Sequence, residues 1–265
     1  MTSSIRPWDR AADLPLPVGR RPRPEAAALP AEELPSLAEL FTFMRDAELR
    51  FDTLRMRIEE HTFGAAGEQV SVVEVALRHP NDARVTTSQP ALGTTASYEM
   101  WISDGEVVRT YSAPHRLGTE RPVRRGVVGV SGPESRDLPG PSRVYAPLTA
   151  LPMETLPETF VHPAGYCQNV LSTGDCRVVG PDQIEGRESL VVECLHPRTI
   201  EMSADRPDFR IRIAVDRADG VILRLEESIG GTVTRDARVT GYEPDAPLGP
   251  NTFDFTFPTG TTMLY

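Results

Sequence analysis

Lysine is absent from this sequence, in which all 28 basic residues are arginine. The chain therefore cannot supply the lysine of a P-loop or of a Schiff base. Acidic residues outnumber basic ones, with 38 Asp and Glu and a formal net charge of -10. Because a nucleic-acid groove needs a surplus of basic charge on one face, we predict that nucleic acid is not a partner.

Long apolar runs are also missing. No stretch approaches the ~20 apolar residues that cross a bilayer, so no transmembrane segment is predicted. The first ten residues, MTSSIRPWDR, have no apolar stretch behind their basic residues, so we see no secretory signal. We therefore expect a cytoplasmic protein, or a protein of the cell envelope if the sequence is a trimmed piece of a longer one.

Catalytic motifs are lacking as well. The sequence contains no G-x-S-x-G, no H-E-x-x-H and no P-loop. Gly126, Gly129 and Gly132 have the wrong spacing for a dinucleotide-binding turn. We therefore expect no enzymatic activity and no cofactor.

Cysteine is scarce, and its three positions leave alternatives open. Cys167 and Cys176 could close a hairpin disulfide in an oxidising compartment. Together with Cys194 and His196 they could form a zinc site, but the short CxxC spacing typical of such sites is absent. Cys194 lies in an apolar alternation, where a free cysteine packs as a small hydrophobic residue. Three free thiols and no metal site are the interpretation that we prefer.

The clearest positive signal is an alternation of apolar and polar residues between Val178 and Gly241. Three runs alternate in this way: Leu190 to Leu195, Phe209 to Val215 and Val221 to Glu226. Turn dipeptides, Asp219-Gly220 and Gly230-Gly231, follow the last two runs. The pattern is typical of antiparallel strands with one buried and one solvated face.

Several phrases in this stretch resemble the LolA-like superfamily, and within it the RseB/MucB type of sigma-factor regulator. They are Gly180 with Ile184-Glu185-Gly186-Arg187, Ile213 to Asp216 with Asp219-Gly220, Val221 to Arg224, the run MWISDGEVVRTY (100–111), and Phe253 to Gly260. The resemblance implies a curved, incomplete barrel around an apolar cavity, covering roughly Leu37 to Gly260. Members of the superfamily carry lipoproteins, bind lipids or sense them for a signalling partner. They usually work outside the cytoplasm, unlike the location expected above.

Two segments are predicted from composition and capping. Residues 1–35 contain seven prolines and no apolar period, so we expect a disordered arm rich in Pro and Arg. Residues 36–265 form a single domain, which begins with a helix capped by Ser36 and Glu39. The apolar stripe of this helix consists of Leu37, Leu40, Phe41, Met44 and Ala47.

Further strands are predicted on either side of two loops. Thr53 to Glu59 alternates, Ser97 to Ser103 and Glu106 to Tyr111 form a hairpin at Asp104-Gly105, and Val123 to Val130 is another candidate. Residues 131–157 are rich in Pro and Gly, and we predict a lid there, or else a surface loop over an edge strand. Phe253 to Phe257 is predicted as a last strand that buries three aromatic rings.

The predicted fold class is α+β dominated by β-structure, with a curved antiparallel sheet, an incomplete half-barrel, wrapped around the N-terminal helix and the lid. The predicted function is non-enzymatic binding of a hydrophobic ligand (a lipid, acyl chain or lipopeptide) as a carrier or sensor. Docking of a partner peptide or protein is the alternative; a closed void favours the former, and a filled core with an exposed edge strand the latter. The expected cavity residues are Phe41, Met44, Leu54, Met56, Ile58, Tyr98, Met100, Ile102, Ile211, Ile213, Leu223 and Phe255, and the expected lid residues are Leu148, Leu151, Met153 and Leu156.

Overall fold

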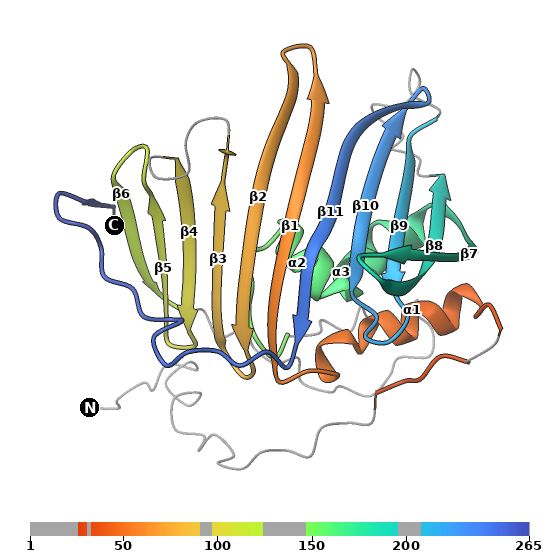
Figure 1. Ribbon diagram of the computed structural model, residues 1–265, viewed down its shortest axis with the longest axis horizontal. Coiled ribbons are helices and arrows are strands. Elements are labelled where there is room, and N and C mark those ends of the chain that lie inside the picture. The colour runs from red at the N-terminus through yellow and green to blue at the C-terminus, as the bar shows by residue number, and fades with distance from the viewer. Residues whose placement is uncertain (1–25, 31–32, 91–96, 124–146, 196–207, 265) are drawn as a thin grey trace, which may run out of the picture.

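The computed structural model describes residues 26–30, 33–90, 97–123, 147–195 and 208–264. Its described residues form one large open sheet in the order β12-β6-β5-β4-β3-β2-β1-β11-β10-β9-β8-β7 (Figure 1). Neighbouring strands are antiparallel except β12, which runs parallel to β6. The helices and strands are α1 (Leu37–Arg45), η2 (Ala47–Leu49), β1 (Thr53–Gly64), β2 (Gly67–Arg78), β3 (Asp82–Ser88), β4 (Tyr98–Asp104), β5 (Val107–Ser112), β6 (Leu117–Pro122), α2 (Leu156–Val161), α3 (Pro163–Asn169), η4 (Leu171–Thr173), β7 (Asp175–Ile184), β8 (Arg187–Leu195), β9 (Arg210–Asp216), β10 (Ile222–Ile229), β11 (Thr232–Pro244) and β12 (Thr262–Leu264).

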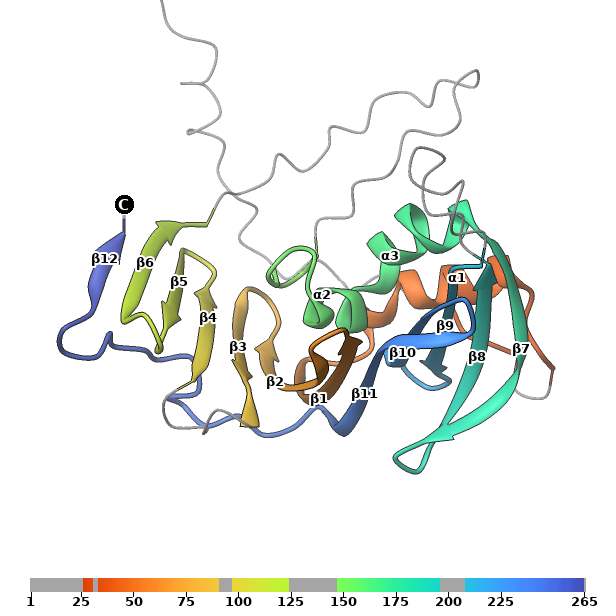
Figure 2. The same cartoon turned by 90° about the horizontal axis from the view of Figure 1, so that it is seen from above.

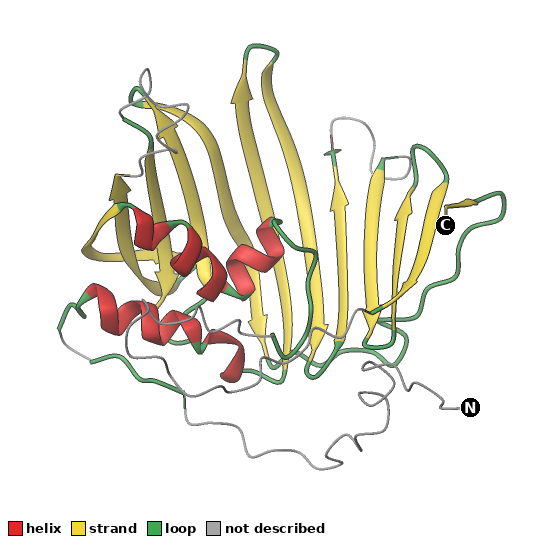
Figure 3. Ribbon diagram, turned by 180° about the vertical axis from the view of Figure 1, so that it is seen from behind, coloured by secondary structure: helices red, strands yellow, loops and turns green. Residues whose placement is uncertain are grey.

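The sheet is curved, and its three α-helices lie on the concave side (Figure 2). They cover only the part made of β1, β11, β10, β9, β8 and β7, which we call the helix-covered half (Figure 3). We call β3, β4, β5 and β6 the open half, because none of the described helices lies over them. The predicted fold class, a β-dominated α+β half-barrel, is confirmed. No helix within the described ranges is long and apolar enough to span a bilayer.

The N-terminal helix forms as the sequence predicts. The Ser36 hydroxyl accepts a hydrogen bond from the Glu39 backbone N–H, and the Glu39 carboxylate accepts one from the Ser36 N–H at 2.8 Å. This capping box satisfies N–H groups that the first turn leaves without partners. The helix buries Leu40, Phe43 and Met44 against the sheet, while Phe41 is half-buried.

Helices α2 and α3 were not predicted. Both begin with a proline in the first turn, Pro157 and Pro163, and they have six and seven residues. Such short helices leave little room for a 3.6-residue period, so no amphipathic stripe marks them in the sequence. They are held by packing, because Phe160 and Val161 of α2 are fully buried.

The hydrophobic core has two separate parts. The larger cluster fills the space between the helices and the concave face of the helix-covered half, and it extends across β2 to Ala83 and Val85 of β3. The smaller cluster, Met100, Ile102 and Tyr111, lies on the convex face of the open half, where Phe255 and Phe257 pack against it.

The prediction of a strand at Phe253 to Phe257 is wrong. This segment has no strand pairing and crosses the convex side of the sheet, and we call residues 253–261 the C-terminal strap (Figure 1). Its rings pack against the sheet instead of extending the ladder: the Phe255 and Phe257 rings meet edge to face with centroids 5.0 Å apart, and the Phe255 centroid lies 6.0 Å from that of Tyr111. The last strand is instead β12, which pairs with β6.

Other predictions fall partly outside the description. Most of the candidate strand Val123 to Val130 and residues 131–146 of the lid are not described, nor are residues 1–25 and 31–32 of the arm. Of the arm's described residues, Ala27 and Pro30 contact the domain. The Ala27 N–H donates to Asp46 at 3.2 Å, and Arg217 donates to the Pro30 carbonyl at 2.8 Å.

Candidate functional site

The open half carries a groove of about 570 Å³ on its concave face. Strands β2 to β6 supply its floor, the segment before and into α2 supplies one wall, and β12 supplies the other. The residues that line it are Glu60, Val73, Val85, Thr87, Glu99, Met100, Trp101, Thr110, Tyr111, Ser112, Leu117, Thr119, Pro152, Thr155, Leu156, Pro157, Arg235 and Leu264. A volume of this size lies within the range of about 300–1,000 Å³ typical of small-molecule sites.

Strand register explains which side chains reach the groove floor. Trp101 lies opposite Val85 on one side and opposite Thr110 on the other, and Thr110 lies opposite Thr119. Since residues directly opposite each other in an antiparallel sheet share a face, these four side chains form one row. The next row contains Thr87, Glu99 and Ser112. The floor therefore mixes aliphatic groups, hydroxyls and one half-buried indole.

Hydrogen bonds to Thr149, which is fully buried, hold the segment before α2 that forms one wall of the groove. The Asn81 backbone N–H donates to the Thr149 hydroxyl oxygen at 2.9 Å, and the hydroxyl and His79 Nδ1 are 2.8 Å apart. The Thr149 carbonyl accepts a hydrogen bond from His162 Nε2 at 2.9 Å. The segment that follows, Leu151 to Leu156, is thereby tied to both the β2–β3 turn and α2.

A buried acid and a buried imidazole meet beneath this wall. Glu48 Oε2 accepts from the Leu148 N–H at 2.8 Å and lies 3.3 Å from His162 Nδ1. Burial raises the pKa of Glu48 to about 7, and burial also lowers the pKa of His162 to about 4. Both shifts favour a neutral pair in which the protonated Glu48 carboxyl faces a neutral imidazole.

One described carboxylate at the groove is in an ion pair with arginine and another is not. Arg235 forms an ion pair with Glu60 at 2.7 Å and lies 4.0 Å from Glu227. Among the described residues, the Glu99 carboxylate has no such contact, and the residue is exposed. The floor therefore carries one unpaired negative charge.

The structure divides the predicted cavity residues between the two faces of the sheet. Met44, Leu54, Met56, Ile58, Ile211, Ile213 and Leu223 join the large buried cluster, with Phe41 packed against it. Tyr98, Met100, Ile102 and Phe255 gather instead at the smaller cluster on the convex face, and Met100 also borders the groove. The first set packs against helices and the second against the C-terminal strap, so the two sets do not line one shared cavity. A ligand-binding role for them remains a prediction.

The predicted lid residues are also divided. Leu151 and Leu156 are buried, Leu148 is half-buried, and Met153 is 81% exposed. Of these four, Leu156 lines the groove. The groove residues that the prediction missed include Thr87, Glu99, Trp101, Thr110 and Thr119 on its floor. The signal for Glu99 and Trp101 was present, because the alternation in β4 sets both on the face opposite Met100.

All three cysteines are free thiols, and the bridge between Cys167 and Cys176 is not formed. Cys176 instead lies directly across from Cys194 on β7 and β8, and its thiol is 3.0 Å from the Leu171 carbonyl oxygen. Burial raises the pKa of the Cys167 thiol to about 12, so this thiol is unreactive. No group of three or more potential metal ligands occurs in the part of the chain that the structure describes.

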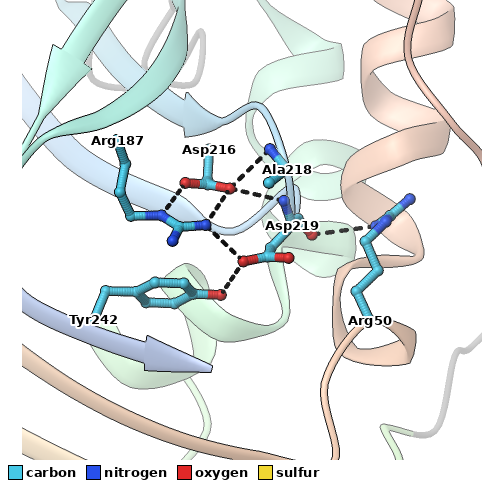
Figure 4. Close-up of polar contacts among 6 residues, drawn as sticks. All are labelled: Arg50, Arg187, Asp216, Ala218, Asp219 and Tyr242. Atoms are coloured by element: carbon cyan, nitrogen blue, oxygen red, sulfur yellow. Dashed lines mark hydrogen bonds and ion pairs between the residues drawn. The ribbon is translucent and has the colours of Figure 1, made fainter. Parts of the chain in front are cut away.

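A polar network ties the β9–β10 turn to its neighbours (Figure 4). Arg187 of β8 pairs with Asp216 and also with Asp219, the latter at 2.8 Å. Its guanidinium lies 4.6 Å from the ring centroid of Tyr242, whose hydroxyl donates to Asp219 at 3.1 Å. Because Asp216 also accepts two backbone N–H groups of its own turn, we assign the network a structural role. It explains the Asp-x-x-Asp-Gly phrase in the sequence.

The fold is similar to those of several solved structures at low sequence identity. The MucA/MucB complex of Pseudomonas aeruginosa matches at a TM-score of 0.46 with 13% identity, covering 83% of this chain and 60% of that one. A LolA superfamily protein from Nitrosomonas europaea matches at 0.33 with 7% identity, covering 84% and 99%. This chain thus spans about 60% of the length of the MucB chain. No protein-family model and no curated protein matches the sequence.

The expectation of a cytoplasmic location is contradicted. A similar fold occurs in an outer membrane lipoprotein-sorting protein domain from Vibrio parahaemolyticus, at a TM-score of 0.32 and 10% identity, covering 82% of this chain and 95% of that one. A fold shared with an envelope protein conflicts with that expectation.

Proposed function

We propose that this chain is a non-enzymatic binding protein that holds the apolar part of a small amphipathic molecule or lipid in the groove. The observation that carries the proposal is the groove of about 570 Å³ around Trp101, on the concave face of the open half, where no described helix lies over the strands. Burial of an alkyl chain contributes about 0.8 kcal/mol per CH₂. A mixed aliphatic and aromatic floor can therefore hold such a chain without many directional contacts.

The groove supports this function better than the space beneath the helices. The concave face of the helix-covered half is occupied by side chains such as Phe160 and Leu171, both fully buried. A ligand there would have to displace a packed core. In the open half, Trp101 and Thr110 are only half-buried, and no such displacement is needed.

The alternative function, docking of a partner peptide or protein, would use a free sheet edge. β7 is such an edge, with Val179 45% exposed. However, a bulge between Val178 and Gly180 and the following Pro181 interrupt its ladder. Bulges and prolines discourage strand addition, so the groove remains the better supported site.

The test compares two substitutions of the same kind on opposite faces. Native mass spectrometry and lipid extraction of the purified protein would be combined with titration of an uncharged fluorescent alkyl probe. Thr110→Arg places a charge on the groove floor and is expected to abolish uptake. Thr86→Arg, on the convex face of β3, should leave uptake unchanged. Protein that co-purifies with no lipid and takes up no probe would contradict the proposal.

A further inference from the structure

The groove floor carries a carboxylate, that of Glu99, with no arginine beside it among the described residues. Arg235 is the one arginine among the described groove-lining residues, and it is already engaged by Glu60 at 2.7 Å and approached by Glu227 at 4.0 Å. Glu99 has no counter-charge among the described residues. An anionic ligand head would therefore meet an uncompensated carboxylate, whereas a cationic head would find a partner.

The surroundings of Glu99 suit a nitrogen that carries several N–H donors. Thr87 and Ser112 are its direct cross-strand neighbours, one on each side. The Ser112 hydroxyl oxygen is buried and has no hydrogen-bond partner. A serine hydroxyl oxygen accepts as well as donates hydrogen bonds. A carboxylate flanked by hydroxyl oxygens can thus take up an ammonium group, which has three donors and no acceptor.

An aromatic ring lies next to this group on the same face. Trp101 is two residues along β4 from Glu99, a separation of about 7 Å between Cα atoms in a strand. Indole is the side chain whose face attracts cations best, at up to about 6 Å from the ring centroid. The same ring offers apolar surface toward Leu156, which lines the opposite wall.

We propose that the groove selects amphiphiles with a protonated amine, which binds at Glu99 between Thr87 and Ser112 while the alkyl chain lies along Trp101 and Leu156. This inference rests on the proposed function and names the class of ligand. An exposed ion pair of this kind corresponds to about a fivefold preference, or about 1 kcal/mol.

The experiment uses three probes with the same alkyl chain: dodecylamine, dodecanol and dodecyl sulfate, each below its micelle-forming concentration at neutral pH. Binding is measured by fluorescence in a Trp8→Phe background, where Trp101 is the remaining tryptophan of the two in the sequence. We expect the amine to bind about fivefold more tightly than the alcohol, and the sulfate more weakly than either.

Two variants decide the origin of the preference. Glu99→Gln should bring the amine and the alcohol to equal affinity without loss of alcohol binding. Glu188→Gln removes the same charge at an exposed position on β8, outside the groove, and should preserve the preference. Equal binding of amine and alcohol by the unmodified protein, or an unchanged preference in Glu99→Gln, overturns this inference alone. If none of the three probes binds, the proposed function fails, and this inference fails with it.

Discussion

The helix-covered half and the open half of this sheet share one hydrogen-bonded ladder, yet the two core clusters lie on opposite faces of it. In the helix-covered half, the concave face carries Ile213, Leu225 and Val192, and the convex face carries ion pairs such as Arg177 with Glu193 at 2.9 Å. In the open half, the convex face carries the aromatic cluster under the C-terminal strap, and the concave face carries the groove. The covering element, rather than the strand itself, decides which face becomes core.

This exchange of buried faces explains how a groove can exist in a stable protein. The core of the open half forms where Phe255 and Phe257 of the strap pack against Tyr111 of β5. Its concave face is then free to keep hydroxyls, a carboxylate and a half-buried indole. Stability and ligand binding are thereby assigned to different faces of the same strands.

The largest difference should appear when a large aromatic side chain is removed from the core beneath the helices and, separately, from the groove floor. Phe160 of α2 is fully buried, so Phe160→Ala is expected to cost about 3–5 kcal/mol in the free energy of unfolding. Trp101→Ala, on the half-exposed floor of the groove, should cost clearly less, because much of its surface already contacts solvent. Chemical denaturation of both variants measures the difference. Equal losses would mean that the groove is as well packed as the core.

Much of the fold could be predicted from local signals. The capping box of Ser36 and Glu39, the turn at Asp104-Gly105 and the alternation in β1, β8, β9 and β10 each act within a few residues. Period-two alternation reports which residues share a face of a strand. These features therefore needed no knowledge of distant contacts.

The candidate site could not be predicted in the same way. Alternation does not report which face will be covered, so Tyr98, Met100 and Ile102 were assigned to the cavity although the strap covers them. The strap itself resembles a strand, because Phe253, Phe255 and Phe257 alternate, and only its packing on the sheet shows otherwise. The groove depends on α2, whose six residues carry no periodic signal.

The buried Glu48–His162 pair next to the groove wall makes a prediction about how stability depends on pH. In the folded protein, the proton shared by the buried pair resides on Glu48, with a pKa of about 7, rather than on His162, with a pKa of about 4. In the unfolded chain, the usual values of 4.5 and 6.5 place it on His162. Between these usual values the pair binds one proton in both states, so its contribution to stability should be almost independent of pH.

Replacing either member of the pair should make the free energy of unfolding depend on pH, in opposite directions for the two variants. In Glu48→Gln only His162 titrates, and its lowered folded-state pKa makes stability rise with pH, by about 1.4 kcal/mol per unit. In His162→Asn only Glu48 titrates, and its raised folded-state pKa makes stability fall as pH rises from about 4.5 to about 7. Urea unfolding at several pH values, compared with the unmodified protein, measures both slopes. Parallel curves for all three proteins would show that the two groups are not coupled to folding.

The smallest expected effect concerns the strap. A Cβ atom added at Gly118 would lie 2.6 Å from the Phe257 ring and 2.9 Å from the Thr261 side chain, whereas one added at Gly241 would lie 3.6 Å from its nearest neighbour in Arg57. Gly118→Ala should therefore cost about 1–3 kcal/mol, and Gly241→Ala should stay within about 0.5 kcal/mol.

Hydrogen exchange identifies where the cost of Gly118→Ala arises. The Thr262 N–H donates to the Arg116 carbonyl at 2.8 Å and reports on the attachment of β12 to β6. If the strap forms the core of the open half, displacement of Phe257 should speed exchange at Thr262 and leave β9 and β10 unaffected. Faster exchange throughout the sheet would show instead that the two halves unfold as one unit, since locally cooperative regions otherwise open independently. The separate packing of the halves would then be a matter of geometry rather than of stability.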